Sequence, residues 1–221
     1  LRSRGLGDVY KRQMEEQMSN ALARKKKRMQ PLGYSKSELI GIQRHAKAQS
    51  NADYLIEESY YNVRMMAYQA LHDKFGFGHK RIIKVEQTID AYVENAKDGT
   101  TGEELGFYLK DKCKIDVREE TNKIPYRESF YLVERKIAPN CMIQANKFLL
   151  AQVFNYFAML GVCLKTQFKF SGNQIRQVYE RIRYLINCLA TGYETMTGIA
   201  SVLEWECKYI DKRFIGKTYE I

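Results

Sequence analysis

The sequence predicts an all-α fold of two tandem three-helix repeats, preceded by a basic helical segment. Residues 71–89 occur twice, because an offset of 93 places Leu71 on Leu164 without a gap. Apolar residues recur in both copies at the spacing of one helix face, which indicates amphipathic helices. The shared positions are Leu71, Phe75, Phe77, Ile82, Val85 and Ile89 in the first copy and Leu164, Phe168, Phe170, Ile175, Val178 and Ile182 in the second.

Each repeat is predicted to contain a long helix, a Phe-x-Phe turn, a second helix, a glycine turn and a third helix. Ser171 with Gln174 three residues later matches a capping box at the start of the second helix. One such unit cannot cover its own apolar stripe, so the copies pack together or each packs on a partner chain, with a homodimer as one arrangement. The long helices are expected at 54–75 and 148–168, and the third helices at 102–114 and 195–208.

Residues 3–13 resemble one translated frame of a sequencing-library adapter, so residues 1–13 are expected to be non-native. Arg2, Arg4, Lys11 and Arg12 against Asp8 account for +3 of the net charge of +10, which leaves +7 on residues 14–221. The expected organisation is a basic helical segment at 14–50, repeat 1 at 51–116, a linker at 117–140, repeat 2 at 141–211 and a tail at 212–221.

Basic side chains are the candidate binding residues. They gather in the unrepeated segment and at the start of the second helix of repeat 1, where free backbone N–H groups suit an anion. The alternatives are a solvated, frayed terminus for the first group and simple helix capping for the second. The candidate nucleic-acid or phosphate contacts are Arg24, Lys25, Lys26, Lys27, Arg28, Arg44, Lys47, Lys80 and Arg81.

Catalytic and metal-binding patterns are absent from the sequence. The five cysteines include no C-x-x-C pair, so buried reduced thiols are expected and no metal or cofactor is predicted. His72 and Asp73 are adjacent on a helix and face different directions, with no nucleophile motif near them. We therefore expect a cytoplasmic binding protein without a membrane span, and enzymatic activity is disfavoured.

The segment ALHDKFGFGHKR at 70–81, with the later DGTTGEEL turn, resembles small helical proteins encoded by phages and prophages of Gram-positive bacteria. The second copy departs from this pattern, since Lys169 and Ser171 replace the glycines. The resemblance implies a phage context in a bacterial host cell.

Three functions follow as hypotheses. The first is a non-enzymatic protein that binds nucleic acid or a host nucleoprotein complex and blocks a defence system such as a CRISPR effector. The second is a sponge or scaffold that holds a small nucleotide signal at the helix N-termini after Phe77 and Phe170. The third is an enzyme acting on nucleotides.

Overall fold

The computed structural model describes residues 36–96, 102–134, 137 and 141–220, with the side chains of residues 36–50 and 96 left outside the description. The chain divides into two compact units, residues 1–50 and 51–221. The second unit contains the repeated stretch and is the part described below. The predicted artefact at 1–13 lies outside the described residues.

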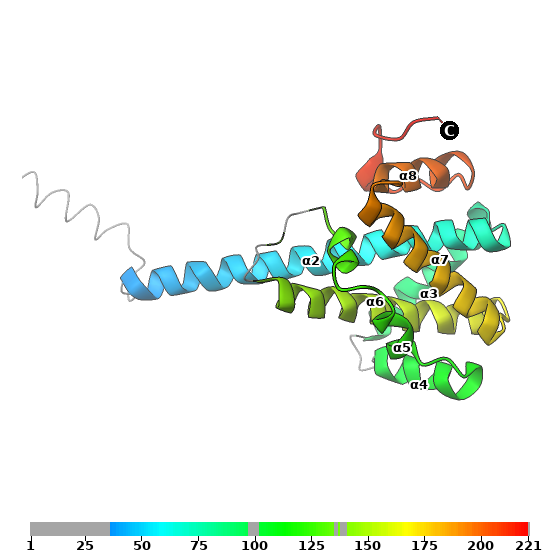
Figure 1. Ribbon diagram of the computed structural model, residues 1–221, viewed down its shortest axis with the longest axis horizontal. Helices are drawn as coiled ribbons and strands as arrows, with labels where there is room; N and C mark the ends of the chain where they lie inside the picture. The colour runs from blue at the N-terminus through cyan, green and yellow to red at the C-terminus, as the bar shows by residue number, and fades with distance from the viewer. Residues whose placement is uncertain (1–35, 97–101, 135–136, 138–140, 221) are drawn as a thin grey trace, which may run out of the picture. The chain divides into compact units, whose positions relative to one another are not determined.

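The all-α class is confirmed for the described part of the chain, which contains helices and no strands (Figure 1). Short 3-10 helices, η1 (Glu128–Leu132) and η3 (Lys212–Phe214), complete it. The α-helices are α2 (Lys36–Phe75), α3 (His79–Ala96), α4 (Gly102–Cys113), α5 (Val117–Asn122), α6 (Met142–Gln167), α7 (Gly172–Thr191) and α8 (Met196–Trp205).

Helix α2 is longer than the predicted helix at 54–75. The sequence suggested a separate helix ending near Ser50, but α2 continues through that position to Phe75. Neither glycine nor proline occurs from residue 42 to residue 75, so no residue there disfavours helix strongly. The helix predicted at 148–168 begins six residues earlier, at Met142, and the ends of the third helices move by up to three residues.

Helix α6 is the central element of the second unit. It contacts α3, α4, α5, α7 and η1, and its residues from Tyr156 to Leu164 are all buried. By length and hydropathy alone α6 could cross a membrane, but 61% of its most apolar window is buried in the fold, as expected of a core helix. Burial on most sides explains why residues 156–164 of this helix are apolar all round.

The turns before α3 and α7 have the same backbone geometry. The N–H of Phe77 donates to the carbonyl of Leu71 at 3.3 Å, and the N–H of Phe170 donates to that of Leu164 at 3.1 Å. The residue between the two phenylalanines is left-handed in both turns, with φ of 61° at Gly76 and 60° at Lys169. The capping box predicted at Ser171 and Gln174 is confirmed.

The four phenylalanines of these turns form one cluster, which we call the phenylalanine quartet (Phe75, Phe77, Phe168 and Phe170). The ring of Phe75 lies 4.7 Å from that of Phe170, and the ring of Phe77 lies 5.0 Å from that of Phe168. These two contacts exchange under the 93-residue offset, as in a self-complementary interface. Phe77 and Phe170 are buried, whereas Phe75 and Phe168 are partly exposed. The other eight predicted core residues are buried without exception.

The described part of the predicted linker at 117–140 contributes several side chains to the core. Asp116 accepts hydrogen bonds from the N–H groups of Arg118 and Glu119 and so caps α5. Val117, Ile124 and Leu132 are buried against the main cluster. The sequence predicts a polar segment because charged residues separate its apolar ones. A short buried face of this kind leaves no apolar periodicity that could reveal it. The tail at 212–221 also contributes to the core, since Phe214 is buried.

We expect Phe77→Ala to lower the free energy of unfolding by about 3 kcal/mol, because it removes a buried ring from the quartet. Phe107→Ala is the matched control, since that ring on α4 is 69% exposed and its loss should change stability by less than about 0.5 kcal/mol. Urea denaturation of the two variants measures both values. Equal effects of the two substitutions would contradict the central role of the quartet.

We expect Gly76→Ala to destabilise the protein by about 1 kcal/mol, because a side chain disfavours the left-handed backbone. Gly78→Ala is the control: a Cβ at either glycine meets nothing within 4 Å, and Gly78 has no left-handed φ. Gly78 is the N-cap of α3, where alanine also costs about 0.5 kcal/mol, so destabilisation of Gly76→Ala beyond that of Gly78→Ala in urea denaturation measures the cost of the left-handed backbone. If both variants are equally stable, the turn does not require the left-handed conformation.

Candidate functional site

Exposed basic side chains surround the phenylalanine quartet, and we call this surface the basic face. Arg81 places its guanidinium 5.4 Å from the centre of the Phe77 ring, and Lys84 places its ammonium 5.7 Å from the Phe168 ring. The other members lie inside a Phe-x-Phe turn or within three residues of one. The basic face comprises Lys74, Lys80, Arg81, Lys84 and Lys169, with the half-buried Lys165 beside them.

Carboxylates next to the basic face already have partners. Asp73 accepts from Arg181 of α7, with the closest N–O distance 2.6 Å. Glu206 lies 2.6 Å from Nε2 of His72, whose Nδ1 is 3.1 Å from the carbonyl oxygen of Phe77. Within the described ranges no base of the basic face forms an ion pair with a carboxylate. Their charges therefore remain available to an anionic partner.

The structure brings only some of the predicted contact residues together. Lys80 and Arg81 are adjacent and exposed in the first turn of α3, as a phosphate contact requires. The five bases from Arg24 to Arg28 lie outside the described residues. Arg44 and Lys47 fall in the part of α2 whose backbone alone is described.

Sequence reasoning missed the bases that approach the quartet from the other turn. Lys169 and Lys165 belong to the second copy, and Lys84 lies two helical turns after Phe77. Lys84 faces the Phe168 ring of the opposite turn, a contact that depends on packing and not on spacing. The available signal was that basic residues flank the Phe-x-Phe motif in both copies.

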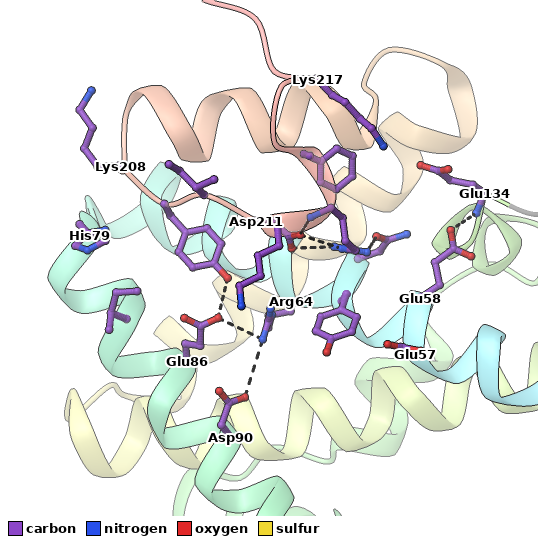
Figure 2. A pocket seen from close by; sticks show the side chains of 18 of the residues that line it. Glu57, Glu58, Arg64, His79, Glu86, Asp90, Glu134, Lys208, Asp211 and Lys217 are labelled. Atoms are coloured by element: carbon purple, nitrogen blue, oxygen red, sulfur yellow. Dashed lines mark hydrogen bonds and ion pairs between the residues drawn. The ribbon is translucent and has the colours of Figure 1, made fainter.

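A cleft of about 960 Å³ lies beside the basic face, within the usual size range of ligand pockets (Figure 2). His79, the first residue of α3, lines it, so the two features are neighbours. Helices α2 and α3, Glu134 and the segment 208–217 form its walls. Both signs of charge face the space, with Glu57, Glu58, Glu86, Asp90, Glu134 and Asp211 opposed by Arg64, Lys208, Lys212, Arg213 and Lys217.

Arg64 is the most enclosed base of the cleft. Its side chain is 13% exposed, and one guanidinium nitrogen lies 3.3 Å from Glu86 and 4.0 Å from Asp90. Burial alone would lower the pKa of Arg64, but the nearby tyrosine hydroxyls and Glu86 together hold it above its ordinary value. The same burial raises the pKa of Tyr60, one turn earlier, to about 12. Arg64 is therefore a permanently charged part of the wall.

Asp211 and Arg213 fasten the C-terminal segment to α2. Asp211 accepts from the backbone N–H of Arg213 at 2.9 Å and from its guanidinium at 3.1 Å. Arg213 also donates to the side-chain oxygen of Asn62 at 2.8 Å, and its guanidinium lies 5.1 Å from the Tyr61 ring. Both arginines of the cleft are thus engaged by protein groups, which leaves Lys208, Lys212 and Lys217 as the bases that face the space.

The described residues offer no metal site, since no group of three or more His, Cys, Asp or Glu side chains converges among them. The five cysteines are free thiols, of which only Cys141 is exposed. Burial raises the pKa of the Cys163 thiol to about 11, which makes it a poor nucleophile. His72 and Asp73 point to Glu206 and Arg181 respectively and not to each other.

No protein-family model, curated protein sequence or solved structure matches this chain. The basic face and the cleft are therefore interpreted from their own geometry.

We expect Asp211→Asn to destabilise the protein by about 1 to 3 kcal/mol at neutral pH, because it removes a charge-assisted partner of Arg213. Burial alone would raise the pKa of Asp211, but the hydrogen bonds from Arg213 lower it below its usual value of about 3.9. A carboxylate with a lowered folded pKa stabilises the fold above its unfolded pKa and loses that effect as pH falls through the folded pKa.

The difference in unfolding free energy between wild type and Asp211→Asn should accordingly shrink below about pH 4. Urea denaturation of both proteins across the acid range measures it. Glu94→Gln, a change at an exposed carboxylate on α3, is the control and should give no comparable pH-dependent difference. A constant difference for Asp211→Asn would show that charge is not the cause.

Proposed function

We propose that this chain is a non-enzymatic protein that binds nucleic acid through the basic face. The observation that carries the proposal is that lysine and arginine side chains without ion pairs gather around one cluster of rings from both Phe-x-Phe turns. Phosphate contacts of lysine and arginine supply most of non-specific nucleic-acid affinity. A nucleoprotein complex of a host defence system remains the setting that the phage resemblance suggests for this activity.

The two halves of the described unit are proposed to be tandem repeats whose turns pack across an approximate twofold axis. Matching left-handed residues, matching closing hydrogen bonds and the reciprocal ring contacts support this relation. Paired turns place the N-termini of α3 and α7 beside the same cluster, and helix N-termini favour anions. The arrangement supports a binding face that neither half could form alone.

Binding of a small nucleotide is a second candidate, favoured by the size of the cleft. The rings of the quartet occupy the space between the two turns, where the sequence predicted the nucleotide. The cleft is therefore the candidate site for such a ligand. The absorbance spectrum of the purified protein separates the candidates. Excess absorbance at 260 nm with oligonucleotide released on denaturation supports the basic face, whereas a released mononucleotide supports the cleft.

We expect the double variant Lys80→Gln/Arg81→Gln to weaken oligonucleotide binding and to make it less dependent on salt. Each lost phosphate contact should reduce the slope of log affinity against log salt by about 1. Fluorescence anisotropy with a labelled oligonucleotide at several salt concentrations gives both quantities.

The matched control is Arg127→Gln/Lys147→Gln, which removes the same charge from exposed positions. Lys147 lies roughly 30 Å along α6 from the Phe168 turn, at 1.5 Å per residue. The control should retain most of the affinity and slope. Binding that is unaffected by salt, or reduced equally by both double variants, would contradict a phosphate-binding role of the basic face.

A further inference from the structure

Two exposed aromatic rings flank the last turn of α2, next to the basic face. Tyr184 of α7 is 55% exposed and Trp205, the last residue of α8, is 42% exposed. Proteins hold unpaired nucleotides with exposed aromatic rings that lie beside lysine or arginine side chains free of ion pairs.

Ion pairs join residues close to each ring to the end of α2. Arg181, one turn before Tyr184, binds Asp73, and Glu206, next to Trp205, binds His72. Asp73 and His72 directly precede Lys74, a member of the basic face. The Cys207 thiol also lies 3.6 Å from the carbonyl oxygen of Phe77, which brings the end of α8 against the first turn. The segments that carry Tyr184 and Trp205 therefore both contact the end of α2, where the basic face begins.

Each ring has a cation over it. The guanidinium carbon of Arg181 lies 4.7 Å from the Tyr184 ring centre, and the ammonium of Lys208 lies 5.9 Å from the Trp205 ring. A cation over one face orients the ring. It also places a positive charge next to any nucleobase that stacks on the exposed part of the ring. Duplex bases are already stacked on one another and cannot use such rings without unpairing.

From this arrangement we infer that the basic face binds a single-stranded nucleic acid whose bases stack on Tyr184 and Trp205. The inference rests on the proposed nucleic-acid binding and adds the class of strand and the residues that recognise it. Lysines and arginines of the basic face hold the phosphates, and the two rings hold bases. Stacking of this kind accepts any sequence, since every base has a π-face.

The chain contains a single tryptophan, so Trp205 reports on its own contacts. The experiment titrates the full chain with a thymidine strand of about twelve nucleotides, within the usual site size, and with a duplex of equal length. We expect the single strand to quench Trp205 fluorescence and to bind at least about tenfold more tightly than the duplex. Anisotropy of a labelled strand measures affinity independently of the tryptophan.

Variants at Tyr184 test the second ring. Tyr184→Leu should weaken single-strand binding by about 5- to 150-fold, the range for loss of one stacked base, while Tyr184→Phe retains a ring and most of the affinity. Tyr193→Leu is the control, because Tyr193 is 88% exposed just beyond the far end of α7. Thermal unfolding checks that each variant is folded.

The outcomes separate this inference from the proposed function. A duplex that binds as tightly as the single strand, or a bound strand that leaves Trp205 fluorescence unchanged, overturns the inference while salt-dependent binding still supports the proposed function. Failure of both nucleic acids to bind overturns the two together. Both are supported if the single strand quenches Trp205 fluorescence and if Tyr184→Leu, but not Tyr193→Leu, weakens its binding.

Discussion

The packing of four phenylalanine rings between two turns is the interaction on which the rest of the described unit depends. It joins the ends of α2 and α6 to the starts of α3 and α7, so four helices are fixed in one place. Aromatic pairs add directional contact to the burial of apolar area, which limits how the turns can be rotated against each other. The lysine and arginine side chains of the basic face are therefore attached to a backbone that is held in place by this packing.

Much of the helical fold was predictable from periodicity, because Ile82, Val85 and Ile89 and their counterparts follow one helix face and are all buried. The capping box at Ser171 was equally predictable, since it depends only on Ser171 and on Gln174 three residues later. Segment 117–140 and the tail were not, because Val117, Leu132 and Phe214 are buried by distant parts of the chain. Tertiary packing, which no local window contains, decides such positions.

The candidate site was predictable only where it is local. Lys80 and Arg81 follow directly from the motif, whereas Lys84 over Phe168 and Glu206 beside His72 join residues far apart in sequence. The cleft likewise combines α2, α3 and the C-terminal segment. Charge composition pointed to a basic surface, but its location required the reciprocal contact of the two turns.

Lys169 occupies a left-handed position at which the equivalent residue of the other turn is glycine. A glycine there would relax the backbone and make the fold more stable, but it would also remove a base from the surface around the quartet. Stability and charge thus select different residues at one site. Lys114 and Lys208 are left-handed as well, so replacing such positions by glycine to gain heat resistance would remove positive charge at three places of the surface.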